Sequence, residues 1–144
     1  MNIKYWKRIA FIASSITHFL LWYFDVLKEF KPDELRDLLS DLFTSSATLI
    51  GFIFAIIAIL VTITEHSLIK VMRENGMYAE IMEHLKYLIT GFSISMLLSY
   101  IGAFLTGESL IYLLLFTSFI FMYSMIMLVT DMFRRLTLTF TNLK

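Results

Sequence analysis

Three long apolar runs constrain the fold of this chain more than any other feature of its sequence. They cover residues 43–64, 85–105 and 109–130, and the only charged residue within them is Lys86, near the start of the second run. At about 1.5 Å of rise per residue, a helix of roughly 20 residues crosses the roughly 30 Å hydrocarbon core of a membrane. Each run is long enough, and Lys86 can extend to the interface from the edge of its run. We therefore expect an all-α integral membrane protein.

The composition agrees with a membrane protein and argues against several other classes of function. Of the 144 residues, 58% are hydrophobic and the formal net charge is zero, so too few polar residues remain to cover a soluble globule. A nucleic-acid-binding protein needs a basic excess to neutralise phosphates, and this chain has none. It contains no Cys, which excludes disulfides and thiolate chemistry. No cofactor is expected.

A fourth run, residues 9–24, is shorter and contains Ser14, Ser15, Thr17 and His18. A cleaved signal peptide is one alternative, but cleavage needs small residues and this run ends in Trp-Tyr-Phe-Asp. A helix lying on the membrane surface is another. If the run crosses, nine Lys and Arg fall on one side and three on the other, the asymmetry that the positive-inside rule describes. We therefore expect four spans in the inner membrane, with both termini cytoplasmic.

The two outer connections of this topology differ in length. Residues 106–108 form only a tight turn, so the third and fourth spans must be an antiparallel hairpin. The other connection, residues 25–42, is longer and contains the only Pro of the sequence. Asp33 and Glu34 follow this Pro, and acidic residues after a Pro are favoured at the start of a helix. Leucines then recur at the spacing of one helical face. We expect a short acidic helix at about residues 33–42, lying on the outer membrane surface.

Small residues are spaced along one face of two spans, and such rows let membrane helices approach closely. The second span has Ala47, Gly51, Ala55, Ala58 and Thr62, and the third has Gly91, Ser95, Ser99 and Gly102. The two rows predict a tight contact between these spans. Association between copies of the chain is the alternative use of the same rows.

No arrangement of residues indicates an enzyme. The sequence GFSI at residues 91–94 has a serine in a setting like that of intramembrane proteases, but no later span supplies a His as base. His66 and His84 lie near acidic residues without a metal-ligand pattern, so no metal site is expected. His18 is the one ionisable residue well inside a span. It could titrate or line a pore, or be a hydrogen-bonded packing residue.

Polar residues recur along the fourth span and its exit. Thr117, Ser124 and Asp131 are seven residues apart, and in an oligomer they could face a water-filled path. An outer ring of acidic helices would concentrate cations at the mouth of such a pore. The simpler alternative is that each hydroxyl bonds to its own backbone. Both interpretations remain open. Four helices of one chain enclose little space, so a pore would need several copies.

Residues 65–86 connect the second and third spans and are expected in the cytoplasm. Apolar residues continue at helical spacing on both sides of Asn75-Gly76, a typical helix end. The segment therefore predicts a helical hairpin that extends the two spans. The tail, residues 134–144, alternates apolar residues with Thr, and a strand, a frayed helix and a membrane-surface segment all remain open.

Residues 43–104 resemble a known family in several respects. FTSSAT at residues 43–48 opens a purely apolar span, a basic residue and an Arg-Glu-Asn-Gly turn follow, and an aromatic residue precedes the direct return into the membrane. This pattern resembles the RexB-type membrane proteins of phage exclusion and related small defence membrane proteins of phages and bacteria. The residues that carry the turn pattern are Lys70, Arg73, Glu74, Asn75, Gly76 and Tyr78.

The resemblance implies an oligomeric ion channel in the inner membrane that depolarises the cell when a cytoplasmic sensor protein reports infection. It also implies that the hairpin is where such a partner acts. A holin-like lysis protein, a non-conducting accessory subunit and a small transporter are the rival interpretations. The lack of a carboxylate within the spans counts against the transporter.

Overall fold

The computed structural model consists of helices joined by short connections. It describes the backbone of residues 3–62 and 67–141, and the side chains of these residues except 3–4, 6, 67–69 and 133–141. The elements are α1 (Ile3–Tyr23), the short 3-10 helix η1 (Val26–Glu29), α2 (Pro32–Thr62), α3 (Ser67–Glu74), α4 (Met77–Gly102) and α5 (Glu108–Thr141). No strand occurs within the described ranges, which confirms the all-α prediction.

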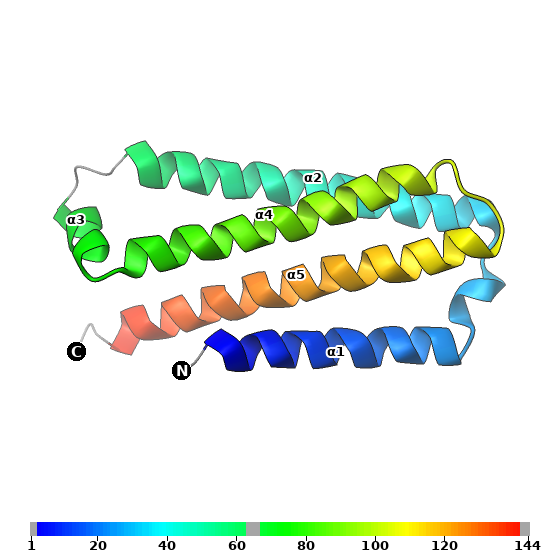
Figure 1. Ribbon diagram of the computed structural model, residues 1–144, viewed down its shortest axis with the longest axis horizontal. Coiled ribbons are helices and arrows are strands. Elements are labelled where there is room, and N and C mark those ends of the chain that lie inside the picture. The colour runs from blue at the N-terminus through cyan, green and yellow to red at the C-terminus, as the bar shows by residue number, and fades with distance from the viewer. Residues whose placement is uncertain (1–2, 63–66, 142–144) are drawn as a thin grey trace.

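The four long helices lie side by side in a bundle (Figure 1). Helix α4 packs against both α2 and α5, and α1 packs along α5. The start of α1, the end of α5 and α3 lie at one end of the bundle, whereas η1 and the turn between α4 and α5 lie at the other (Figure 1). We refer to these as the inner and outer ends, after the predicted orientation.

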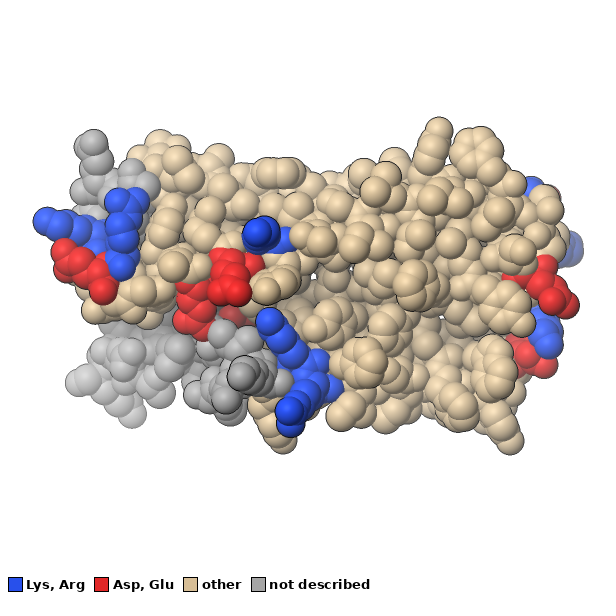
Figure 2. Space-filling model, viewed as in Figure 1, with Lys and Arg blue, Asp and Glu red and all other residues tan. Residues whose placement is uncertain are grey.

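The surface of the bundle suits a membrane. Three helices in the described ranges, α2, α4 and α5, are long and apolar enough to cross one. Large apolar side chains such as Phe52, Leu97 and Phe116 are exposed on all three. On the face shown in Figure 2, charged side chains lie at the right-hand end and also reach from the left-hand end to near the middle of the bundle, and an uncharged band separates the two groups. These features indicate a membrane protein.

Helix α1 is a distinct case. It is not among the three candidate spans, and its sequence includes Lys7, Arg8 and His18. Nevertheless it runs beside α5 (Figure 1) and exposes Phe11 and Phe19, both more than half accessible. The prediction of four spans therefore remains a prediction.

The acidic segment expected as a separate surface helix is the first part of α2. Residues 33–42 and 43–62 form one helix without a break, because no Gly or Pro interrupts the chain after Pro32 until Gly51. Two of its four leucines, Leu35 and Leu39, are buried in a cluster with Leu110 and Leu114 of α5, whereas Leu38 is exposed. The segment is therefore not a separate helix, and its position on the outer membrane surface stays a prediction.

The predicted contact between two rows of small residues is also wrong for α2. All five of its small residues, from Ala47 to Thr62, are exposed, and nothing lies within 4 Å of a Cβ built on Gly51. The buried face of α2 carries Leu39, Ser46 and Ile53 instead, each seven residues from the next. Each residue turns the helix by about 100°, so a row displaced by one position faces another direction.

The corresponding row on α4 is buried as expected, and it meets two helices. Ser95, Ser99 and Gly102 are buried and Gly91 is half-buried. A Cβ at Gly91 would overlap the Ser124 Oγ of α5, and one at Gly102 would overlap the Leu39 Cδ1 of α2. The glycines of α4 therefore permit close approach to both neighbours.

At the inner end, α3 and α4 are joined at Asn75 and Gly76. Gly76 has a φ of 73°, a left-handed conformation that glycine adopts without strain. The predicted continuation from the second span into α3 lies at residues 63–66, outside the described residues. Helix α5 continues to Thr141, well beyond the predicted end at 130, so most of the tail is helical.

Candidate functional site

The interior of the bundle contains an unusual number of polar side chains. They come from all four long helices, and seven of them are less than 9% accessible. We name this set the interior polar ladder: Ser14 and His18 of α1, Ser46 of α2, His84, Ser95 and Ser99 of α4, and Thr117, Ser118 and Ser124 of α5. Polar groups are costly to bury in an apolar protein, so a set of this size needs an explanation.

The ladder extends through most of the apolar thickness. On α4 alone its members run from His84 to Ser99, which spans about 22 Å at helical rise. Contacts between helices link it sideways at intermediate depths. Ser46 Oγ donates a hydrogen bond to Ser95 Oγ at 3.3 Å. Ser124 lies against Gly91.

Hydroxyls inside and outside the bundle differ in their hydrogen bonds. The exposed Thr44, Thr48, Thr62 and Thr90 each donate to the backbone carbonyl four residues earlier, at 2.8 to 3.0 Å. This local bond is the usual way to satisfy a hydroxyl in lipid. The buried hydroxyls of Ser14, Ser99 and Thr117 make no hydrogen bond within the described part of the protein, and neither does His84 Nε2. The simple interpretation, that each hydroxyl bonds to its own helix, therefore holds for the exposed hydroxyls and for the part-buried Ser118, but not for Ser14, Ser99 and Thr117.

His18 and Ser118 form the most specific contact of the ladder. His18 Nδ1 lies 2.8 Å from the Ser14 carbonyl oxygen, and His18 Nε2 lies 2.9 Å from Ser118 Oγ. Ser118 Oγ is also placed to donate to the Leu115 carbonyl at 3.1 Å. The ring of Phe119 meets the imidazole edge-on, with centroids 5.5 Å apart. The imidazole is therefore held in one orientation, facing α5.

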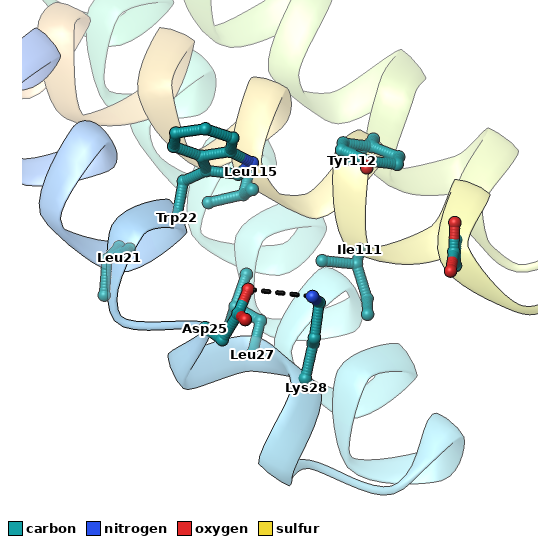
Figure 3. A pocket seen from close by; sticks show the side chains of 9 residues that line it. Leu21, Trp22, Asp25, Leu27, Lys28, Ile111, Tyr112 and Leu115 are labelled. Atoms are coloured by element: carbon teal, nitrogen blue, oxygen red, sulfur yellow. Dashed lines mark ion pairs between the residues drawn. The ribbon is translucent and has the colours of Figure 1, made fainter.

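A small charged cavity of about 70 Å³ lies at the outer end, between α1, η1 and α5 (Figure 3). Its polar lining comes from Asp25, Lys28, Glu108 and Tyr112, and Lys28 Nζ is paired with Asp25 Oδ1 at 3.0 Å. The hydrogen bond and the opposite charge of Asp25 raise the pKa of the Lys28 ammonium above its ordinary value. Its apolar wall includes Trp22 and Leu115, which lie about one helical turn from His18 and Ser118 respectively.

A larger cavity of about 340 Å³ lies towards the inner end, between α1, α4 and α5. Most of its lining is apolar, including Phe119, but Lys7, His84 and Ser124 also contribute. Lys7 Nζ lies 4.5 Å from the centre of the Tyr87 ring. Along both α1 and α5, the His18–Ser118 pair lies between the linings of the two cavities.

A third cavity, of about 240 Å³, opens between α2 and α4 at the outer end. Arg36, Ser40 and the ladder residue Ser99 line it. Cavities thus reach the ladder from both ends. Its middle, formed by Ser14, Ser46, Ser95 and Thr117, is fully inaccessible.

The structure separates the predicted pore residues. Thr117 and Ser124 are buried inside the chain against α4 and its neighbours, instead of facing a path between copies. Asp131 is half-buried and has an interaction of its own. His18 joins the first two in the ladder. Sequence reasoning missed Ser14, Ser46 and Ser118, since nothing in their spacing separates an inward hydroxyl from one bonded to its own helix.

The residues predicted for gating or partner binding lie at the inner end. Lys70, Arg73, Glu74, Asn75 and Gly76 are exposed, and Tyr78 is half-buried. The Arg73 guanidinium lies 5.4 Å from the centre of the Tyr78 ring, across the turn. No group of three His, Cys, Asp or Glu side chains that could hold a metal ion occurs among the described residues.

Comparisons with family models, curated proteins and solved structures give no match to this chain.

Proposed function

We propose that the protein is an ion-conducting membrane protein whose pathway follows the interior polar ladder, and that its opening lowers the membrane potential. The observation that carries this proposal is a series of buried polar side chains between cavities at the two ends. Polar groups within a membrane are expensive and usually mark the route of an ion. Because the middle of the ladder is inaccessible, the described structure corresponds to the closed form.

The proposal includes four spans, with α1 as the first. Two observations support this. Helix α1 supplies His18 and Ser14 to the ladder and exposes large apolar residues on its other side. The beginning of α1 and the end of α5 also lie at the same end of the bundle (Figure 1), as an even number of spans requires.

The oligomer is a further part of the proposal. The exposed row on α2, with Gly51 and Ala55 at its centre, has no partner among the residues that the structure describes. Rows of this kind suit close packing against another membrane helix, and a second copy would supply one. Gly51→Leu is therefore expected to reduce association in detergent while leaving the fold unchanged. Equal association of the variant and the parent protein would exclude this row as the interface.

The phage-exclusion setting rests only on the resemblance of residues 43–104 to RexB-type proteins. In that setting, a cytoplasmic sensor acts on the exposed turn between α3 and α4 and opens the pathway in the inner membrane. The test is a potential-sensitive dye in cells that express the protein with or without its neighbouring genes, before and after phage challenge. Depolarisation that requires infection or a partner supports the proposal.

Other results of the same measurement separate the rivals. Immediate lysis on expression alone indicates a holin-like protein. An unchanged membrane potential under every condition indicates a non-conducting accessory subunit and overturns the proposal.

Gly76→Leu tests the role of the turn. A left-handed backbone costs a residue with a Cβ about 1 to 2 kcal/mol, so the turn should rearrange. The expected result is normal insertion with reduced triggered depolarisation. Full activity of the variant would remove the turn from the gating mechanism. Asn75→Ala changes a side chain of the same turn but keeps Gly76, so comparing the two variants separates loss of the backbone conformation from loss of a side chain.

A further inference from the structure

The species that crosses the closed middle of the ladder can be named from the geometry of one residue pair. We propose that the protein conducts protons and that His18, with Ser118, is the group that holds the proton in transit. This inference rests on the proposed function and specifies the ion that the ladder carries.

The first step concerns space. The middle of the ladder is packed: Ser14, Ser46, Ser95 and Thr117 have no accessible surface. A metal ion or a chloride ion needs room for itself and for the oxygens or waters that replace its hydration shell. A proton needs only donors and acceptors within hydrogen-bond distance. In this closed form the packing therefore leaves room for a proton but not for a hydrated ion. Donor and acceptor lie within hydrogen-bond distance across helices at Ser46–Ser95 and at His18–Ser118, whereas the hydroxyls of Ser14 and Thr117 have no such partner among the described residues.

The second step concerns the protons on His18. A backbone carbonyl can only accept, so the 2.8 Å contact with the Ser14 oxygen requires that Nδ1 carries a hydrogen. The other nitrogen, Nε2, faces Ser118 Oγ, which can either donate or accept. Of the two nitrogens, only Nε2 can therefore gain or lose a proton in this arrangement.

The third step is that both protonation states fit the same heavy-atom positions. When the imidazole is neutral, the Ser118 hydroxyl donates to Nε2. When the imidazole is protonated, Nε2–H donates to Ser118 Oγ, and the hydroxyl turns to the Leu115 carbonyl at 3.1 Å. Each state satisfies all three polar groups. The pair can thus hold a proton, or be without it, after rotation of one hydroxyl alone, and release towards the other cavity requires the ring to turn as well.

The fourth step is the location of the pair. Leu115 and Trp22 line the outer charged cavity, whereas Phe119, in contact with the imidazole, lines the inner cavity. The titratable and charged groups that face the pair across these cavities are Asp25, Lys28, Glu108 and Tyr112 outside and Lys7, His84, Tyr87 and Tyr123 inside.

The transfer itself is balanced. Ser118 passes its hydroxyl proton to Nε2 as it takes one from the outer cavity, which forms the imidazolium. Rotation of the ring towards Phe119 then lets Nε2 release one proton to the inner cavity, and the neutral imidazole returns. One proton enters and one leaves, with no oxidant or co-reactant.

The experiment uses the purified full chain in vesicles of phosphatidylethanolamine and phosphatidylglycerol. A pH-sensitive dye inside the vesicles reports proton uptake, driven by a potassium diffusion potential set with valinomycin. Separate vesicles without valinomycin report potassium and sodium movement through a potential-sensitive dye. We expect proton uptake without comparable potassium or sodium movement, and a fall of about tenfold or more in His18→Gln and Ser118→Ala. Ser118→Thr, which keeps the hydroxyl, should restore uptake.

Thr17→Val is the matched control. Thr17 lies next to His18 on α1, but its hydroxyl donates to the backbone carbonyl of Ala13 in the same helix. Proton uptake should therefore be unchanged in this variant. If potassium or sodium moves and proton uptake is the same in the parent protein and in His18→Gln, this inference is overturned. The channel proposal then still stands. Vesicles that pass no ion under any driving force overturn both.

A second measurement does not depend on transport. In ¹⁵N spectra of the histidine side chains, His18 is identified by the signals absent from His18→Gln. We expect its Nδ1 to carry a hydrogen, because this nitrogen faces the Ser14 carbonyl oxygen. A neutral tautomer with hydrogen on Nε2 and none on Nδ1 contradicts the proposed proton positions.

Discussion

Helices α2 and α4 carry similar rows of small residues, but only one row is buried. The row on α4 meets Ser124 and Leu39 so closely that Gly91 and Gly102 have no room for a Cβ, whereas Gly51 on α2 has open space around it. Hydroxyls differ in a similar way: exposed ones such as those of Thr48 and Thr90 bond to their own helix, whereas the buried ones of Ser14, Ser99 and Thr117 have no partner among the described residues. The comparison shows that a residue type has no fixed role in this bundle. Its role depends on whether a neighbouring helix faces it.

The largest expected effect comes from filling the space at Gly91. In Gly91→Ala the new Cβ overlaps the Ser124 Oγ and lies 3.3 Å from the Ser124 Cβ, so α4 and α5 must move apart. Overpacking of this kind typically costs about 1 to 3 kcal/mol. The free energy of unfolding in detergent micelles, or the denaturant midpoint, measures it.

Gly51→Ala is the control for this prediction. It meets no atom and replaces a glycine within a helix, so it should stabilise the protein by about 0.5 to 1 kcal/mol. An equal decrease in the free energy of unfolding of Gly91→Ala and Gly51→Ala would mean that the row on α2 is packed as tightly as the row on α4.

An intermediate effect is expected from Thr117→Val. The hydroxyl that this change removes is fully buried and makes no hydrogen bond, so the free energy of unfolding should rise by about 1 kcal/mol. Ion flux in vesicles should fall, because the ladder loses a polar group. Thr48→Val, at an exposed and self-bonded hydroxyl, should change stability by less than about 0.5 kcal/mol and leave flux intact. Unchanged flux in Thr117→Val would indicate that this hydroxyl has only a packing role.

The smallest effect is expected at the outer end, where the side chains of Lys28 and Asp25 are both largely exposed. The pKa of Lys28 is raised in the folded protein. The ion pair therefore stabilises the fold fully at pH values below the ordinary lysine pKa, and this stabilisation is lost as the pH rises through the pKa of Lys28 in the folded protein. Asp25→Asn should return the pKa of Lys28 towards its ordinary value, as measured by NMR titration of the ε-methylene signals. Glu29→Gln nearby is the control and should leave that pKa unchanged.

The sequence was sufficient to predict the helices but not which of their faces pack together. Apolar runs and the Asn75-Gly76 break predict α4, α5 and the turn before α4, because length and composition alone determine them. Which face of α2 turns inward could not be predicted, since Ile, Leu, Ala and Gly are all compatible with lipid. The shapes of the side chains determine which face of α2 is buried, and that face carries Leu39, Ser46 and Ile53.

The candidate site was only partly predictable for a related reason. Thr117, Ser124 and His18 could be identified as polar residues within spans, but whether a hydroxyl faces its own backbone or the interior depends on the helix opposite. Ser118 becomes informative only when α1 brings His18 to within 2.9 Å of it. The extension of α2 over residues 33–42 was missed because its leucines fit a membrane surface as well as they fit α5.

The cavities at the two ends also determine where the membrane voltage acts. A membrane potential normally falls across the whole hydrocarbon core, at about 2.3 kcal/mol per elementary charge per 100 mV. If water fills the outer charged cavity and the inner cavity, most of that drop is confined to the thin layer that contains His18 and Ser118. A proton held on the imidazole, as proposed, then experiences an intense local field. An energised membrane would in this way act on the same pair of side chains that we propose carries the proton.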